Sequence, residues 1–409
     1  MVSFSLRRLN RLGFVFCVLL CLVAAVGAAQ APATPAPQLS PDSVIAIGDI
    51  HGDFDDFIRI LQRAGLIDEQ HNWSGGKATF VQCGDEIDRG PKVREVMDFL
   101  MAFPDQAAKA GGRVVLVLGN HEVMNMMGDL RYVTPQNYAS FAGADSEKRR
   151  KAAFEDYEKW YKRNAHIFAK AMPPITEMHE AEWMASHPAG FLEQRDAFGP
   201  SGQYGKWLRK LPAVAQVGKI AFMHGGIHPS LTSMSLDTIN SRVHEELRNF
   251  DDIKQYLVSQ KLILPYFTLQ EIADVVRAEA GNLRNSPGLA DASRDQEVKM
   301  LQEFMQSGNW VSMNLNGPLW FRGYDSWSDE EGASEISKVL EKYHLDHIVV
   351  GHTVQRTGRI RNRFGNKVFL IDTGMLSSYY PGGRASALNI QDEKFSAEYL
   401  DQPQPTPLQ

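Results

Sequence analysis

The feature that most constrains this chain is a turn at residues 84–90, with the sequence Gly-Asp-Glu-Ile-Asp-Arg-Gly. It directly follows an apolar run, residues 78–83, which predicts a buried strand. A strand that ends in glycine and then presents Asp85 can aim a carboxylate into the crevice at the carboxyl edge of an open α/β sheet, where such sheets bind ligands. The turn therefore predicts a polar site at a sheet edge.

Similar strand-turn units recur along the chain. Apolar runs lead into polar, glycine-flanked turns at 48–52 (Gly-Asp-Ile-His-Gly), 84–90, 119–122 (Gly-Asn-His-Glu), 224–226 (His-Gly-Gly) and 351–353 (Gly-His-Thr). A further apolar run, residues 367–371, leads into Asp372, which we interpret as a solvated or supporting group. A single turn of this kind is common, and its histidine is usually a core or surface residue. Five of them, each after an apolar strand, favour one shared site.

Helical periodicity alternates with these strands. Residues 55–64 and 92–103 carry apolar side chains at helical spacing, so each can cover one face of a sheet. Strand, turn and helix in repetition predict an α/β core. Residues 136–211 carry many aromatic side chains among charges at helical spacing, which predicts a helical insert. The insert is either a packed subdomain or a cap over the active-site mouth, and a second helical excursion is expected at about 240–305.

Six side chains at the strand ends are candidate metal ligands: Asp49, His51, Asp85, Asn120, His224 and His352. Carboxylate, imidazole and amide oxygen together suit manganese, iron or zinc, whereas calcium prefers sites made only of oxygen ligands. Six ligands, with one carboxylate able to bridge, predict two divalent metal ions about 3.5 to 4 Å apart. We assign Asp49 and His51 to the first ion and Asp85 to both. The remaining three ligands belong to the second ion.

Two ions held in this way would activate a water for in-line attack on phosphorus. The leaving oxygen then needs a proton, and His121 is the candidate general acid because Asp88 can hold one imidazole nitrogen and leave the other free. Arg89 offers a forked donor for phosphate oxygens. Asn120 is also a candidate substrate contact. Arg322 is a second candidate arginine, although an arginine close to a tryptophan is as often structural.

The N-terminus predicts export. Arg7, Arg8 and Arg11 precede an apolar run at 12–26 and small residues at 27–29, which is typical of a signal peptide cleaved near Ala29. A retained membrane anchor and a twin-arginine signal are the alternatives. We expect a periplasmic or secreted protein with no stable membrane insertion after cleavage.

Composition limits the partners and the domain organisation. The formal net charge is -6, and the one basic run, residues 148–151, lies in a helical pattern, so nucleic acid is not an expected partner. After a signal at 1–29 and a Pro/Ala-rich linker at 30–42, we expect one domain at 43–400 and a flexible tail at 401–409.

At its strand-end turns the chain resembles the calcineurin-like metallophosphoesterases, and within them the phosphoprotein phosphatases. Residues 122–125 (Glu-Val-Met-Asn) resemble the Shewanella-like branch of these phosphatases. The resemblance implies a central β-sandwich flanked by helices, a two-metal centre, and hydrolysis of phosphate esters of serine, threonine or tyrosine on phosphoproteins or phosphopeptides. It also supports the roles given above to Asp88, Arg89 and His121.

Two alternatives to a phosphoprotein phosphatase were weighed. A nucleotide phosphatase, such as a diadenosine tetraphosphate hydrolase, resembles the same motifs, but export argues against its mainly intracellular substrates. A non-catalytic binding module on the same fold would not need the ligand set together with His121 and Asp88.

Overall fold

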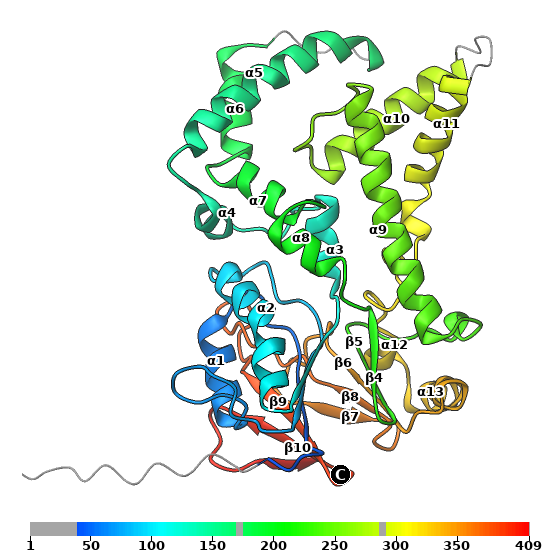
Figure 1. Ribbon diagram of the computed structural model, residues 1–409. Coiled ribbons are helices and arrows are strands. Elements are labelled where there is room, and N and C mark those ends of the chain that lie inside the picture. The colour runs from blue at the N-terminus through cyan, green and yellow to red at the C-terminus, as the bar shows by residue number, and fades with distance from the viewer. Residues whose placement is uncertain (1–38, 169–174, 286–291, 409) are drawn as a thin grey trace, which may run out of the picture. The chain divides into compact units, whose positions relative to one another are not determined.

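The computed structural model describes residues 39–168, 175–285 and 292–408 (Figure 1). The predicted signal peptide lies outside this part of the chain, as does most of the linker. Among the helices that are described, none combines the length and the apolar character needed to cross a lipid bilayer.

The first sheet carries three of the five ligand-bearing turns. Its strand order is β11-β10-β9-β1-β2-β3. The strands β1 (Val44–Ile47), β2 (Thr79–Gln82) and β3 (Arg113–Leu116) are parallel and lie side by side, with Val44 opposite Thr79 and Thr79 opposite Arg113. Because neighbouring parallel strands end at the same edge, the turns that follow them meet there.

The second sheet carries the other two turns. Its order is β4-β5-β6-β8-β7. At its centre, β5 (Ile220–Met223), β6 (His347–Val350) and β8 (Val368–Leu370) are parallel, while β4 (Val214–Val217) and β7 (Arg361–Arg363) pair antiparallel at the edges.

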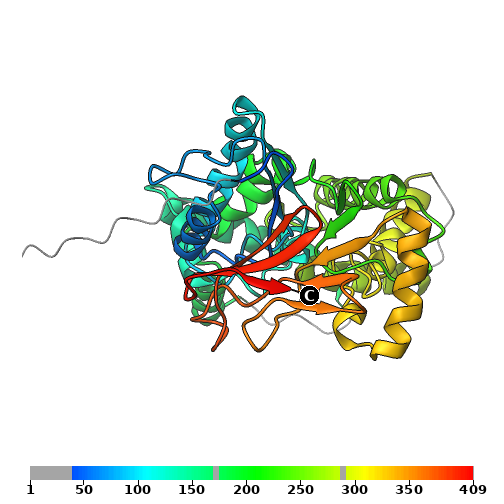
Figure 2. The same cartoon turned by 90° about the horizontal axis from the view of Figure 1, so that it is seen from below.

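One apolar layer joins the two sheets. Ala46 and Val81 of the first sheet belong to the same buried cluster as Phe222, Val349 and Phe369 of the second. In Figure 2 the red strands of the first sheet and the orange strands of the second lie next to each other, with helices beyond both. The α/β sandwich flanked by helices that the sequence predicts is confirmed.

Helices cover the outer faces of the sandwich. The helices α1 (Phe54–Arg63) and α2 (Val93–Lys109) share a buried cluster with the first sheet, to which Phe57, Leu61 and Val96 contribute. On the second sheet, α13 (Asp329–Tyr343) buries Ile336 and Val339 in a cluster with strands β6 and β8. A short helix, α12 (Gly323–Ser326), precedes it.

The remaining helices form the two excursions (Figure 1). The first contains α4 (Pro135–Phe141), α5 (Ser146–Asn164), α6 (Glu177–Ser186), α7 (Phe191–Phe198) and α8 (Gln203–Leu208). The second contains α9 (Leu236–Ser259), α10 (Leu269–Asn285) and α11 (Ala292–Met305). The indole of Trp160 donates a 2.7 Å hydrogen bond to the Leu262 carbonyl, and Phe154, Trp183 and Phe191 share a buried cluster. The aromatic side chains of the insert therefore act as its core.

Two parts of the chain differ from expectation. No strand is expected after residue 371, yet β9 (Ser386–Gln391) and β10 (Lys394–Tyr399) form a hairpin that joins the first sheet beside β1. The expected flexible tail at 401–409 is wrong at Thr406–Leu408, which forms β11 and pairs antiparallel with β10. The exposed edge of β10 offers unpaired backbone groups, and β11 satisfies them.

Candidate metal centre

The six predicted ligands come together at the carboxyl ends of strands from both sheets. All six are buried: Asp49, His51, Asp85, Asn120, His224 and His352. One carboxylate oxygen lies at the centre of the group, because Asp85 Oδ2 is 3.7 Å from His51 Nε2 and 3.2 Å from His224 Nε2. Asp85 is thus placed between the two proposed ligand sets.

Hydrogen bonds determine which nitrogen each histidine presents. The Nδ1 atom of His51 lies 2.9 Å from the Ile87 carbonyl, and Nδ1 of His224 lies 2.9 Å from the Cys83 carbonyl. For His352 it is Nε2 that lies 3.1 Å from a backbone carbonyl. Because a carbonyl only accepts, each of these nitrogens donates, and the opposite nitrogen keeps its lone pair for the centre. The nitrogens that face the centre are Nε2 of His51, Nε2 of His224 and Nδ1 of His352.

The oxygen ligands face the same space. Asp49 Oδ2 lies 3.7 Å from His51 Nε2, while Asp49 Oδ1 accepts a 2.9 Å hydrogen bond from the backbone of His352. Asn120 Oδ1 lies 2.9 Å from His224 Nε2. Asp49 therefore lies beside His51 and also contacts the backbone of His352, while Asn120 lies beside His224.

Two groups of three side chains bring their ligand atoms within 4.8 Å of one another. One is Asp85, His224 and His352, as assigned to the second ion. The other is His51, Asp85 and His121. We keep the role of general acid for His121, whose Nδ1 lies 2.7 Å from a carboxylate oxygen, Asp88 Oδ2.

The protonation states of His51 and His352 suit metal ligands, whereas for His224 the effect of burial is outweighed by the charges of Asp85 and Asp49, which raise its pKa to about 9. Burial, together with the neighbouring His121, lowers the pKa of His51 well below its ordinary value, and burial with His224 does the same for His352. Both imidazoles are therefore neutral, which is the form that binds metal. Burial opposes ionisation of Asp85, but the nearby His224 and His121 outweigh it and hold the pKa of Asp85 well below its usual range.

A third buried carboxyl group, Asp372, lies close to those of Asp49 and Asp85. Burial raises the pKa of Asp372 to about 6, and burial followed by the charge of Asp372 raises the pKa of Asp49. Asp372 Oδ1 accepts a hydrogen bond from the backbone of Gly374, but within the described residues Oδ2 has no partner. Buried carboxylates this close together are costly unless cations lie between them. The residues present therefore fit divalent metal ions.

The ligand-bearing turns use unusual backbone conformations. Five residues of the site that are not glycine have positive φ: His51 (49°), Asp85 (58°), Asp88 (68°), Arg89 (64°) and His352 (65°). Such conformations are strained for residues with a Cβ and cluster at functional sites. At Gly84, φ is +82° and a Cβ would meet the Gly119 nitrogen at 2.5 Å, so only glycine allows the turns after β2 and β3 to approach this closely.

Glu122 also fixes the turns after β2 and β3 through hydrogen bonds to their backbone. It lies in the first turn of α3 (Asn120–Met127), a helix that the sequence analysis did not predict. Its carboxylate accepts hydrogen bonds from the backbone nitrogens of Gly119, Asp85 and Glu86, at 2.8, 2.9 and 3.0 Å. Burial and the charge of Glu122 raise the pKa of Glu86 well above its ordinary value. The Glu122 carboxylate therefore holds the turns after β2 and β3 in one geometry.

His121 and Asp88 form a buried pair beside the ligands. Besides its contact with His121, Asp88 accepts hydrogen bonds from Asn125 Nδ2 at 3.0 and 3.1 Å. The other imidazole nitrogen, His121 Nε2, lies 3.7 Å from Asp85 Oδ2 and 3.1 Å from a guanidinium nitrogen of Arg89. Asp88 therefore fixes the ring so that Nε2 points into the site.

Arg89 lies among aromatic rings that the sequence analysis did not single out. Its guanidinium carbon is 5.2, 5.1 and 5.4 Å from the ring centroids of Tyr132, Tyr379 and Tyr380. It also donates to the Tyr380 hydroxyl at 2.5 Å and contacts Nε2 of His51. Stacking against these rings orients the guanidinium toward the ligands.

A cavity of about 470 Å³ opens beside the ligands. Its lining includes Arg89, Arg322, His352, Arg356 and Tyr380. Arg322 therefore shares the cavity with Arg89, and its Nη1 donates to the His352 carbonyl at 3.0 Å. None of the residues that line the cavity lies between 136 and 211, so the cap interpretation of the insert gains no support from the described part of the chain.

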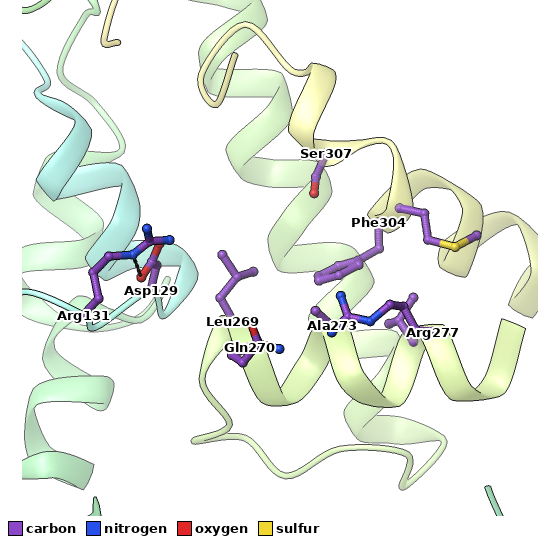
Figure 3. Close-up of a pocket in the computed structure, with 10 residues that line it drawn as sticks. Asp129, Arg131, Leu269, Gln270, Ala273, Arg277, Phe304 and Ser307 are labelled. Carbon is purple, nitrogen blue, oxygen red and sulfur yellow. Dashed lines mark hydrogen bonds and ion pairs between the residues drawn. The ribbon is translucent and has the colours of Figure 1, made fainter. Parts of the chain in front are cut away.

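A second cavity, of about 510 Å³, lies among the helices (Figure 3). Leu269, Ala273 and Arg277 of α10 line it on one side, and Asp129 and Arg131 point into it from the segment after α3. None of the six candidate ligands contributes to its wall. Of the two, the cavity beside the metal ligands is therefore the better placed to hold a substrate.

Comparisons with known proteins agree with this geometry. Residues 43–356 match the sequence profile of the calcineurin-like phosphoesterases. The chain is 28% identical over 365 residues to Shewanella-like protein phosphatase 1 of Plasmodium berghei, a match that covers 87% of this chain and 74% of that one. It is 32% identical to Shewanella-like protein phosphatase 2 of Arabidopsis thaliana, over 51% of this chain and 53% of the relative. A crystal structure of a cold-active protein-tyrosine phosphatase from a psychrophilic Shewanella species superposes with a TM-score of 0.55 at 25% identity, covering 93% and 87% of the two chains.

Proposed function

The chain belongs to the calcineurin-like phosphoesterase family, and we propose that it hydrolyses phosphomonoesters on proteins with the help of two divalent metal ions. A hydrolase of the phosphatase type follows from the family match and the phosphatase relatives. The observation that carries the finer proposal is the His121–Asp88 pair, at 2.7 Å, directly beside the ligands gathered around Asp85.

The proposed ion sites share Asp85, with Asp49 and His51 on one side and the remaining three ligands on the other. Manganese, iron or zinc suits these ligands. When bound, such ions supply Lewis acidity to the phosphoryl oxygens and lower the pKa of a water that attacks phosphorus.

His121 supplies the proton that the leaving oxygen needs. Burial lowers the pKa of His121, but the charge of Asp85 and the hydrogen bond to Asp88 outweigh it, so the pKa is raised overall. Because Nδ1 is held by Asp88, the protonated ring carries its second proton on Nε2, the atom that faces the site. Transfer of this proton leaves the ring neutral, with its Nδ1–H still bound to Asp88.

Arg89 and Arg322 bind the phosphate in this proposal. Both line the cavity beside His352, and a guanidinium can donate two parallel hydrogen bonds to phosphate oxygens. The rings of Tyr132, Tyr379 and Tyr380 surround Arg89 and provide an aromatic surface next to the phosphate. Such a surface suits the ring of phosphotyrosine, and the match to a protein-tyrosine phosphatase supports that preference.

The test compares substrates of one purified chain. The protein is stripped of metal, resupplied with manganese, iron or zinc, and assayed on matched phosphotyrosine and phosphoserine peptides and on diadenosine tetraphosphate. We expect peptide hydrolysis that requires metal and is lost in His121→Ala, while His166→Ala, which removes an exposed histidine of the helical insert, behaves as wild type. Hydrolysis of the dinucleotide alone would refute the proposal in favour of a nucleotide phosphatase.

We also propose that the chain is exported and cleaved near Ala29, on the pattern of residues 7–29. N-terminal sequencing of the protein recovered from outside the cytoplasm tests this. A chain that keeps residues 1–29 would argue for the membrane anchor instead.

A further inference from the structure

The cavity beside the metal ligands carries more positive charge than one phosphate requires. Three arginines line it: Arg89, Arg322 and Arg356. Its one carboxylate, Asp325, is already engaged, because Asp325 Oδ1 accepts from Gln355 and from Arg361 Nη1, each at 3.3 Å. The arginines of the cavity therefore face a space in which a bound anion would meet little competition.

The three arginines differ in what they contact. Arg89 contacts the ligand His51, and its guanidinium also lies 3.1 Å from Nε2 of His121. Arg89 therefore faces the phosphate that is hydrolysed. Arg322 spans the rim through hydrogen bonds to the His352 carbonyl and, at 3.1 Å, to Thr353 Oγ1. Arg356 is exposed on the loop after β6, and in the described part of the chain no hydrogen bond or ion pair engages its side chain.

The second cavity provides a contrast. There Arg131 is bound to Asp129 at 2.6 Å (Figure 3). Arg277 is bound to Asp274 at 2.5 Å. A guanidinium that is neutralised by a neighbouring carboxylate has little attraction left for a ligand. Among the described residues no carboxylate forms an ion pair with Arg356, which leaves its charge available to a bound substrate.

We propose that Arg356 selects phosphoprotein substrates that carry a second anion, a glutamate or aspartate beside the phosphorylated residue. This inference rests on the proposed function and adds to it the kind of residue expected beside the phosphorylated one. A cavity of about 470 Å³ has room for the phosphorylated side chain and part of a neighbouring residue. With Arg89 at the metal ligands, Arg356 is the cation placed to receive the flanking carboxylate.

The test uses two phosphopeptides that differ only at the residues flanking the phosphorylated one, which are glutamate in one peptide and glutamine in the other. For the metal-loaded wild type we expect kcat/KM to be about threefold to tenfold higher for the acidic peptide, as for a partly exposed ion pair. The preference should shrink at high salt, because ionic screening weakens exposed pairs.

Variants connect the preference to this side chain. Arg356→Gln should bring the two peptides to equal kcat/KM and leave hydrolysis of the neutral peptide within twofold of wild type. Arg356→Glu should reverse the preference. Arg59→Gln is the matched control, because it removes the same charge from an exposed arginine on α1 and should keep the wild-type preference.

The outcomes separate this inference from the function it rests on. Equal kcat/KM for both peptides in the wild type, or a preference that survives in Arg356→Gln and Arg356→Glu, would overturn the role of Arg356 and leave the phosphatase proposal standing. If neither peptide is hydrolysed with any metal, the proposed function itself falls and takes this inference with it.

Discussion

Replacement of Asp88 by asparagine tests the proposed general acid most directly. Asp88 has φ of 68°, a conformation that asparagine tolerates better than most residues, so the backbone should keep its shape. The substitution removes the negative charge that His121 Nδ1 meets at 2.7 Å and leaves an amide of nearly the same size. Because the asparagine amide can donate a hydrogen bond to Nδ1, the substitution also permits the neutral imidazole tautomer that has no proton on Nδ1.

The expected size of the effect follows from this contact. A hydrogen bond to a charged group contributes about 1.5–3 kcal/mol, and each 1.36 kcal/mol corresponds to a tenfold change in rate. If the whole contribution is made in the transition state, kcat on a phosphotyrosine peptide should fall by about 10- to 150-fold. His121→Ala removes the acid altogether and should cost about 10² to 10⁴.

The assay compares leaving groups. Tyrosine has an unperturbed pKa of about 10 and needs a proton as it departs, whereas p-nitrophenolate is stable as an anion. Asp88→Asn should therefore lose far less activity on p-nitrophenyl phosphate than on the peptide. Metal content and thermal unfolding serve as controls that the centre is intact. An equal loss on both substrates would refute the general-acid role, since it would show that Asp88 acts on the metal centre or the fold instead.

Three further outcomes are expected. Removing metal should lower the Tm, and resupplying it at about 100 times its Kd should restore about 2.7 kcal/mol of the free energy of unfolding. Calorimetry should show little of this gain in Asp85→Asn, because Asp85 lies within reach of both ligand sets. Gly84→Ala should lower the free energy of unfolding, measured by denaturant titration, by about 3 kcal/mol or more, because its Cβ would meet the Gly119 nitrogen. Gly76→Ala is the control: its φ is +56° and nothing lies within 4 Å of the added Cβ, so it should cost only about 1–2 kcal/mol of backbone strain. The pKa of Glu86 is raised above its ordinary value of 4.5, so the native state holds a proton that the unfolded chain releases as the pH rises past that value. The stability of the metal-free protein should therefore decline as pH rises above about 4.5, and Glu86→Gln should flatten this dependence in urea unfolding at several pH values; an unchanged slope would contradict the assignment.

The strand ends could be predicted because their signals are local. Each ligand follows an apolar run and sits beside a glycine, as Asp85 follows β2 and Gly84, so a short stretch of sequence carries the information. The same kind of signal was present at Asp372, which follows β8 and was interpreted as a solvated or supporting group; its burial excludes the first of these and fits the second. Its closeness to Asp49 depends on β8 lying next to β6 in the second sheet, an order that periodicity does not reveal.

Side chains on irregular loops could not be found in this way. Tyr132, Tyr379 and Tyr380 come from segments without periodic pattern, and they meet Arg89 only because the two loops converge in the fold. Arg356 was missed for the same reason. The hairpin of β9 and β10 was missed for a different reason: its turn residues, Asp392 and Glu393, both have positive φ but are not the Asn-Gly or Asp-Gly pair that marks such turns in a sequence.

The division of the centre between two sheets also sets a time order for a newly made chain. Asp49 and the backbone of His352, which are joined by a hydrogen bond, are separated by 303 positions. The turns after β1, β2 and β3 can form early, but His224 and His352 follow β5 and β6, and the second sheet needs β6 before its central pairing is complete. A ribosome must therefore release residues beyond 352 before any nascent chain has a full ligand set, so activity should appear only near the end of synthesis and not in shorter intermediates.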